Sequence, residues 1–167
     1  MPIACVLDMD ETLGFFDKYH FHVRPHLDVL IHFLRFCNIR TYIWSLGKDE
    51  YVKRMINIYM PEVKDYVYKI FARKESEKAL NLYGWRKPSQ HIRDECEETL
   101  ILIGIDDQSE RNMDDGYDFK LGISPYDEVN PKDISFLKII DEIMVYLLRN
   151  SIKIDYNSDF KTAFTDE

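Results

Sequence analysis

Carboxylates stand at short spacing directly after two apolar segments of this sequence. Asp8 and Asp10 follow the apolar run 3–7, and Asp106 and Asp107 follow a second apolar run. Carboxylates that are forced together repel one another and shift one another's pKa values, so such a cluster is tolerated mainly when a cation neutralises it. A ligand set made only of oxygens favours Mg²⁺, which keeps several waters and shares its shell with phosphate. The four aspartates therefore indicate a Mg²⁺ site.

The chemistry that fits these groups is phosphoryl transfer to a carboxylate. Asp8 would attack phosphorus in line and form an aspartyl-phosphate, while Mg²⁺ and Lys87 would offset the charge on the phosphoryl oxygens. Asp10 is near enough along the chain to protonate the leaving oxygen and later to deprotonate the attacking water. Ser45 and the backbone amides of residues 9–11 would orient the phosphoryl group by hydrogen bonds.

A solvated loop or a calcium-binding loop is the alternative interpretation of residues 8–11. The calcium pattern needs glycine at the sixth place and glutamate at the twelfth, and Leu13 and Tyr19 stand there. The paired aspartates after the second run would, without the first motif, be an ordinary turn. Several other basic residues compete with Lys87 for the role of the cation: Lys69, Lys74 and Arg86.

The elements that must position these side chains alternate between strands and helices. Apolar runs without polar alternation predict strands over residues 3–7, 41–44, 66–71, 99–105 and 119–123. Apolar residues at helical spacing predict helices over 24–38, 49–60, 89–98 and 130–150, and 74–82 suits a helical turn or a loop. Pro25 falls in a first helical turn, Asp49 can cap the second helix and Pro61 ends it. Residues 130–133 combine a cap, a first-turn proline and an acid at a helix start.

This alternation predicts an α/β fold, a single-domain Rossmann-like three-layer sandwich with a mostly parallel central sheet. In such sheets ligands bind beyond the carboxyl ends of the strands, where the candidate residues stand. A chain of 167 residues has room for one domain. We expect that domain over 1–150 and a polar tail over 151–167. Residues 13–23 leave room for a small hairpin, which makes the cap over the site minimal.

The segment Asp8-Met-Asp-Glu-Thr-Leu13 resembles the DxDxT motif of the haloacid dehalogenase superfamily. It is similar in particular to the branch that contains phosphatases of the RNA polymerase II C-terminal domain. The resemblance spans roughly residues 3–149 and keeps the further motifs in family order: Arg24-Pro25-His26, the segment 44–51 with Ser45 and Tyr51, Lys87, and Asp106-Asp107. It implies a Mg²⁺-dependent phosphatase with these catalytic residues: Asp8, Asp10, Thr12, Ser45 and Lys87. The metal would be held by Asp8, the Asp10 carbonyl and Asp107, with Asp106 in the first or second shell.

The substrate implied by the resemblance is phosphoserine or phosphothreonine in a protein such as the RNA polymerase II C-terminal domain. Residues 64–93 carry eight Lys or Arg against three Asp or Glu, so this segment is a local basic island. Within it, Arg73 resembles the arginine that the family places beside the substrate phosphate, and we expect it to bind substrate. The small cap predicts an open site that accepts a phosphopeptide, whereas a solvated basic face is the alternative.

Two further hypotheses remain open at the level of sequence. Gly47 and Pro88-Ser89 depart from the family pattern, which would suit a catalytically degenerate binding module of the same fold. A phosphatase for nucleic-acid ends is the other alternative, although the net charge of −8 disfavours direct nucleic-acid binding.

Apolar runs, cysteines and histidines give expectations about membrane association, the cellular compartment and other metal sites. No apolar run approaches the ~20 residues of a membrane span, so no membrane association is expected. The thiols of Cys5, Cys37 and Cys96 have no paired spacing, which predicts buried thiols and an intracellular, reducing compartment, either cytoplasm or nucleus. The histidines lack matched metal spacing and are expected to be structural or surface groups: His20, His22, His26 and His32.

Overall fold

A five-stranded sheet forms the centre of the molecule. The structure is a computed structural model, and it describes residues 2–96 and 100–157. The strand order is β5-β4-β1-β6-β7, and neighbouring strands pair in parallel. The strands are β1 (Ile3–Leu7), β4 (Arg40–Trp44), β5 (Lys69–Phe71), β6 (Ile101–Asp106) and β7 (Phe119–Gly122). The predicted α/β fold with a parallel central sheet is confirmed.

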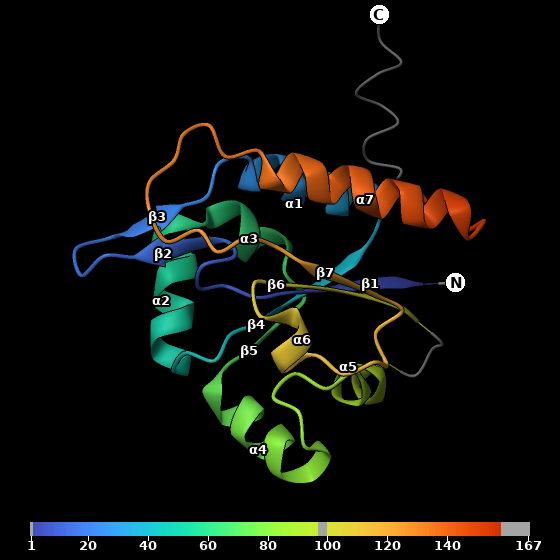
Figure 1. The fold of residues 1–167 in the computed structure, drawn as a ribbon, viewed down its shortest axis with the longest axis horizontal. Helices are drawn as coiled ribbons and strands as arrows, with labels where there is room; N and C mark the ends of the chain where they lie inside the picture. The colour runs from blue at the N-terminus through green and yellow to red at the C-terminus, as the bar shows by residue number, and fades with distance from the viewer. Residues whose placement is uncertain (1, 97–99, 158–167) are drawn as a thin grey trace, which may run out of the picture.

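Helices cover both faces of this sheet, as Figure 1 shows. On the upper side in that view, α1 (Leu27–Phe36) and α7 (Ser135–Arg149) lie side by side. The lower layer holds α4 (Arg73–Tyr83), α5 (Ser89–Glu95) and α6 (Ser109–Asn112). Two further helices, α2 (Asp49–Tyr59) and α3 (Pro61–Tyr66), follow each other in the chain, and α3 contacts both α1 and α2. The arrangement is the three-layer sandwich that the sequence predicts.

The strand β1 shows why the central strands carry no polar alternation. Its side chains at Cys5 and Leu7 belong to the apolar cluster under α1 and α7. Those at Ala4 and Val6 belong to the second cluster, which includes Trp44 from β4. Because both faces are covered by helices, every residue of β1 is buried, and an apolar run is the only pattern that suits it.

A two-stranded antiparallel hairpin, β2 (Gly14–Phe16) and β3 (Phe21–Val23), follows β1 at the left of Figure 1. It is the small hairpin predicted for this segment. Gly14 is required there, because a Cβ at this position would clash with the carbonyl oxygen of His22. The hairpin lies at the carboxyl end of β1, beside the residues that follow that strand.

Several predicted boundaries are wrong, and a tertiary contact explains one of them. Asp49 is the first helical residue of α2 rather than its cap, and Pro61 opens α3, which shortens the predicted strand 66–71. The last helix begins at Ser135 rather than near 130, because Asp133 is engaged by a buried arginine, as described below.

Other segments come close to their predicted bounds. The segment 74–82 lies within a helix, α4. Pro25 lies before α1 and not, as predicted, in its first turn, because the helix begins at Leu27 after His26 takes a left-handed backbone conformation. The predicted helix 89–98 ends at Glu95, and residues 97–99 lie outside the described part of the chain.

The chain after α7 stays close to the core for several residues, where Ile152 and Ile154 pack against the upper apolar cluster. The three cysteines are buried free thiols, as predicted. Within residues 2–96 and 100–157, no helix has the length and apolar character of a membrane span.

Candidate active site

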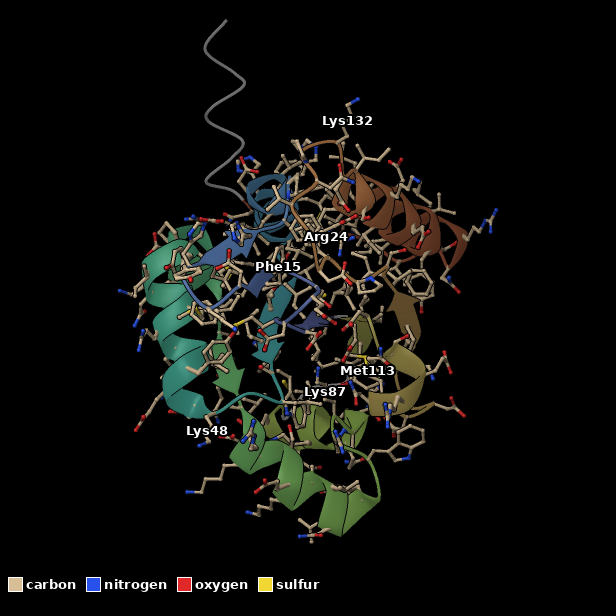
Figure 2. All side chains as sticks on the ribbon, turned by 60° about the vertical axis from the view of Figure 1, so that its left-hand side comes forward. Phe15, Arg24, Lys48, Lys87, Met113 and Lys132 are labelled. Carbon is tan, nitrogen blue, oxygen red and sulfur yellow. The ribbon has the colours of Figure 1, made fainter. Side chains whose placement is uncertain are left out.

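The candidate residues meet at the carboxyl edge of the sheet. Asp8 directly follows β1, Ser45 follows β4, and Asp106 is the last residue of β6. The Asp8 amide donates to the carbonyl of Ile105 at 2.9 Å, which fixes these two strand ends to each other. Figure 2 turns this side of the molecule toward the reader, with Lys87 near the middle of the view. The chain winding therefore brings together the side chains that the sequence placed after separate strands.

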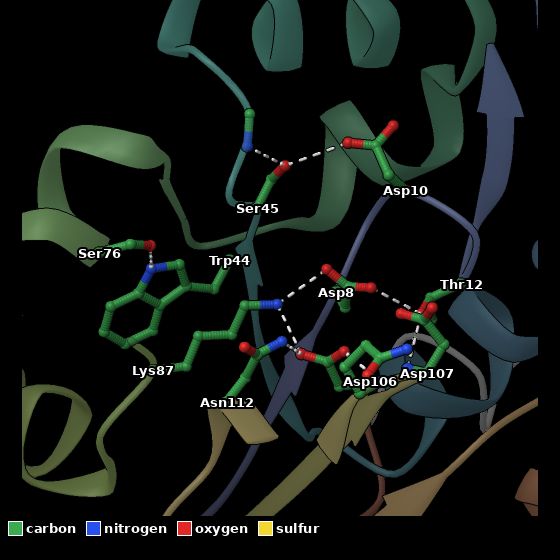
Figure 3. A network of polar contacts seen from close by, with 12 residues as sticks. Asp8, Asp10, Thr12, Trp44, Ser45, Ser76, Lys87, Asp106, Asp107 and Asn112 are labelled. Carbon is green, nitrogen blue, oxygen red and sulfur yellow. Dashed lines mark hydrogen bonds and ion pairs between the residues drawn. The ribbon is translucent and has the colours of Figure 1, made fainter. Parts of the chain in front are cut away.

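Lys87 lies between two carboxylates and is fully buried, at 0% exposure. Its Nζ donates to Asp8 Oδ1 at 2.7 Å and to Asp106 Oδ2 at 2.6 Å (Figure 3). Burial alone would lower the pKa of Lys87, but the two carboxylates outweigh it and raise this pKa. Among the competing residues, Lys69 instead pairs with Glu95 at the surface. The two carboxylates thus favour the charged form of Lys87 at the centre of the site.

Asp106 anchors this ammonium group instead of facing solvent. Its side chain accepts hydrogen bonds from Asn112 Nδ2 at 3.2 Å and from the Gln108 amide at 2.8 Å. Asn112 is a site residue that the sequence analysis missed, and it stands at the end of the four-residue helix α6. The carboxylate of Asp106 therefore has three donors in addition to its burial, which fixes its orientation.

Thr12 connects the first motif with the second pair of aspartates. Its hydroxyl donates to Asp8 Oδ2 at 2.8 Å and accepts from the Asp107 amide at 3.2 Å. The backbone amides of Thr12 and Leu13 both donate to the carbonyl of Met9, which closes a turn directly after Asp8. Thr12 thereby positions Asp8 and Asp107 relative to each other.

Asp10 has surroundings different from those of Asp8. Tyr51 donates to its Oδ1 at 2.8 Å, and Ser45 approaches its Oδ2 at 3.5 Å. Burial raises the pKa of Asp10, and the hydrogen bond from Tyr51 partly opposes that shift. Ser45 in turn accepts from the Gly47 amide at 3.0 Å. Two carboxylates with separate partners can take separate roles, one as a nucleophile and one as an acid and base.

The carboxylates also form a group that suits a divalent cation. Oxygen atoms of Asp8, Asp106 and Asp107 lie within 4.8 Å of one another. Burial raises the pKa of Asp8 to about 7 and also raises the pKa of Asp107, so the metal-free cluster resists full ionisation. A hard cation would reverse this effect, because it stabilises the ionised oxygens. The carboxylate of Asp10 bonds to Tyr51 instead and is not one of these three.

An open cleft of about 510 Å³ lies beside Asp10, with this lining: Asp10, Leu46, Gly47, Lys48, Tyr51 and Arg73. Arg73 is held at its rim, because its Nε donates to the Leu46 carbonyl at 3.0 Å. Leu46 and Arg73 also line a neighbouring cleft of about 400 Å³, which reaches Arg86. A cavity of about 770 Å³ at the opposite edge of the sheet contains none of the predicted site residues.

Comparisons with known proteins place this geometry in context. A family model described as NLI interacting factor-like phosphatase matches residues 3–151. A search of curated proteins returns no match. The RNA polymerase II CTD phosphatase Fcp1 of fission yeast, bound to beryllium fluoride, superposes with a TM-score of 0.52 at 11% identity, over 93% of this chain and 58% of that chain.

Two more solved structures show the same fold. A second Fcp1 structure aligns with a TM-score of 0.50 at 14% identity, over 89% of this chain and 50% of that chain. An uncharacterized protein from Listeria monocytogenes serotype 4b aligns at 0.51 and 14% identity, over 86% of this chain and 97% of that one. This chain therefore spans little more than half the length of the Fcp1 structures.

Proposed function

The chain belongs to the family of NLI interacting factor-like phosphatases, and on that premise we propose that it hydrolyses phosphomonoesters through an aspartyl-phosphate on Asp8. The observation that carries the proposal is the position of Asp8 between two donors, Lys87 at 2.7 Å and Thr12 at 2.8 Å. Both donors orient the carboxylate, and the ammonium of Lys87 also offsets the charge of an incoming phosphate.

In the first half of the reaction an Asp8 oxygen forms a bond to phosphorus while the bond to the leaving oxygen breaks. Asp10, whose pKa is raised by burial, donates the proton that the leaving oxygen takes up. In the second half Asp10 accepts a proton from a water whose oxygen forms a bond to phosphorus, the bond between phosphorus and Asp8 breaks, and inorganic phosphate leaves. Ser45, next to Asp10, and the amides of residues 9–11 hold the phosphoryl oxygens.

Mg²⁺ is the cofactor that we propose, held by Asp8, the Asp10 carbonyl and Asp107, with Asp106 behind them. When bound, the ion would neutralise the charge that develops on the phosphoryl oxygens. Asp106 contributes mainly by fixing Lys87, because its own carboxylate is fully buried and bonded to three donors.

The proposed substrate is a phosphoserine or phosphothreonine in a protein, such as the RNA polymerase II C-terminal domain that the names of the Fcp1 structures mention. The cleft beside Asp10 is open and continues past Arg73 toward Arg86, which suits a chain that extends on either side of its phosphate. Lys48 and Arg73 give its rim positive charge, and we propose that Arg73 contacts the substrate.

Replacement of the nucleophile tests the proposal. Asp8→Asn and Asp8→Glu should each lower kcat for p-nitrophenyl phosphate in the presence of Mg²⁺ by at least about 1,000-fold, as expected for loss of a covalent nucleophile. Asp28→Asn, which changes an exposed carboxylate on α1, is the matched control and should keep wild-type activity. Full activity in either Asp8 variant, with the fold verified by circular dichroism, would end the proposal.

A further inference from the structure

We infer that the β2–β3 hairpin carries a second metal site, for a divalent transition metal of the Zn²⁺ class, formed by Asp17, His20 and His22. Atoms of these three side chains that can ligate a metal all lie within 4.8 Å of one another. The site is separate from the oxygen cluster at the strand ends, since it shares no residue with it. The inference does not depend on the proposed phosphatase function.

The geometry of the hairpin turn gathers the three side chains. Asp17 and His20 flank the turn, and the Asp17 amide donates to the His20 carbonyl at 3.3 Å. Lys18 takes a left-handed backbone conformation, with φ of 88°, which turns the chain sharply between them. His22 stands two residues after His20, so the extended chain presents both rings on one face, with centroids 4.0 Å apart.

The carboxylate of Asp17 is already oriented as in a metal ligand. Its Oδ1 accepts from the amides of Tyr19 at 3.0 Å and His20 at 3.1 Å. The other oxygen, Oδ2, is thereby turned toward His22, whose Nε2 lies 2.6 Å away. Carboxylates that ligate metals are commonly held by hydrogen bonds of this kind. An ion bound here would take the place of the proton between Oδ2 and the His22 ring.

Aromatic neighbours orient the two imidazole rings as well. Phe15 stacks on His22, with ring centroids 4.9 Å apart and planes 27° apart. Tyr59 of α2 lies against His20 at 6.1 Å and 28°. Both rings are therefore positioned by the fold, and less side-chain freedom is lost when they bind an ion.

An ordinary surface ion pair between His22 and Asp17 is the simpler interpretation of the short contact. That ion pair uses one imidazole only, whereas the hairpin holds a second ring, that of His20, with its centroid 4.0 Å from that of His22. Two imidazoles and one carboxylate form a donor set that favours zinc and similar ions over Mg²⁺, which prefers oxygens alone. The hairpin and the strand-end cluster thus differ in the metals they select.

An ion at this position would close the tip of the hairpin. Two-stranded hairpins have little stability by themselves, and a cross-link between Asp17 and His20 opposes the opening of the turn. The hairpin also reaches the candidate active site, because Phe16 contacts the ring of Tyr51 at 6.1 Å and Tyr51 donates to Asp10. A metal that fixes the hairpin therefore stabilises one wall of the cleft.

Calorimetric titration of the tag-free full chain with Zn²⁺, in excess Mg²⁺ that occupies the strand-end cluster, tests the site. We expect one Zn²⁺ equivalent for the wild type, and a Kd at least about tenfold weaker in His20→Gln and in His22→Gln. His32→Gln, on the surface of α1, removes a histidine outside the cluster and should leave the Kd unchanged. Wild-type protein that binds no Zn²⁺, or unchanged binding in both hairpin variants, would overturn the inference.

Co²⁺ gives a second readout, which does not rely on variants at the histidines. Paramagnetic Co²⁺ should broaden the ring resonances of His20 and His22 at one equivalent and leave those of His32 sharp. Asp17→Asn keeps the shape of the side chain, and its fold in the absence of metal can be verified by circular dichroism. It should weaken Co²⁺ binding at least about tenfold, whereas broadening at His32 first would contradict the site.

Discussion

Lys87 compensates the charge of the buried carboxylates at the strand ends. It lies 2.7 Å from Asp8 and 2.6 Å from Asp106, and all three side chains are buried. Removing one partner of a buried ion pair leaves charge without compensation, which is costlier than losing a surface pair. The ammonium group that we propose to offset the charge of a phosphate therefore also stabilises the metal-free protein.

We predict that Lys87→Ala lowers the free energy of unfolding by about 3–5 kcal/mol in the presence of a chelator. Mg²⁺ should restore part of this loss, because an ion that binds only the folded state stabilises it. Urea denaturation with and without Mg²⁺ measures both effects. Lys53→Ala, which breaks the exposed pair with Asp49, should cost less than about 1 kcal/mol. Equal stability of the two variants in chelator would contradict this role of Lys87.

Tyr51 is the residue that tunes Asp10. Burial raises the pKa of Asp10, and the Tyr51 hydroxyl opposes that shift because it favours the ionised carboxylate. Tyr51→Phe should therefore raise the pKa of Asp10 further. Asp10 must be ionised to accept a proton from water, so activity is lost as the pH falls through its pKa. The acidic limb of the kcat profile should move to higher pH in Tyr51→Phe.

The pH profile of kcat for p-nitrophenyl phosphate at saturating Mg²⁺ measures this shift. Tyr59→Phe, on the same helix α2 but without a hydrogen bond to Asp10, serves as the control. An acidic limb that stays in place in Tyr51→Phe, or moves to lower pH, would show that Asp10 does not act as the base.

At the scale of elements, Arg24 makes hydrogen bonds that connect separate segments of the chain. Its guanidinium is 1% exposed and binds both oxygens of Asp133 at 3.1 Å. It also donates to Ser135 at the start of α7 at 2.8 Å and to the Thr12 carbonyl at 3.4 Å. The residue after the hairpin thus contacts both the loop after Asp8 and the start of the last helix, and its side chain is labelled in Figure 2.

Arg24→Ala should destabilise the protein by about 3–5 kcal/mol, because it leaves a largely buried Asp133 without its partner. It should also lower kcat, since the loop that carries Thr12 loses a fixed contact. Arg35→Ala, on the exposed face of α1, should stay within about 0.5 kcal/mol of the wild type. Thermal unfolding measures the stability of both variants, and steady-state kinetics measure kcat. An Arg24→Ala protein as stable as Arg35→Ala would contradict this structural role of Arg24.

The sequence predicts well those helices and strands whose bounds depend on residues close by in the chain. The strand β1 and the aspartates after it could be predicted, because burial on both faces leaves an uninterrupted apolar run. The start of α7 could not, since Asp133 is bound by Arg24, which lies 109 residues away in the chain. The turn residues 130–133 alone resemble a helix start.

The same distinction holds for the site. Asp8, Asp10 and Asp107 follow strands, so their positions alone make them candidates. Lys87 is preferred over Lys69 only through the family resemblance, and the contact with Asp8 that supports this choice depends on the winding of the chain. Asn112 carries no signal in the sequence, because its role follows from one hydrogen bond to Asp106. Sequence spacing predicts that His20 and His22 are structural or surface groups, because it does not show that the turn at Lys18 brings Asp17 next to them.

At the scale of the whole molecule, the small hairpin leaves the cleft open. An open site gains substrate affinity from contacts that flank the phosphate rather than from closure over it. We predict that phosphoserine and phosphothreonine peptides are cleaved with higher kcat/KM than sugar phosphates, nucleotides or a 3′-phosphorylated oligonucleotide. A strong preference for a small metabolite over every phosphopeptide would contradict the open-site account.

Arg73 at the rim of that cleft should contribute binding rather than chemistry. Arg73→Ala should raise KM for a phosphopeptide more than it lowers kcat, as for loss of uniform binding. Lys78→Ala, which removes an exposed cation from the same helix α4, should change neither constant. Initial rates over a range of peptide concentrations separate the two constants, and a fall in kcat alone would place Arg73 in the chemical step.

The most direct test of the central claim is to trap the phosphorylated enzyme. Acid quench of the Mg²⁺-loaded protein during turnover of a ³²P-labelled substrate should leave label on the chain that hydroxylamine removes, as expected of an acyl phosphate. Borohydride reduction followed by mass spectrometry should place homoserine at position 8 and nowhere else. A protein that turns over substrate without such a label, or with the label on Ser45, would contradict the assignment of Asp8 as the nucleophile.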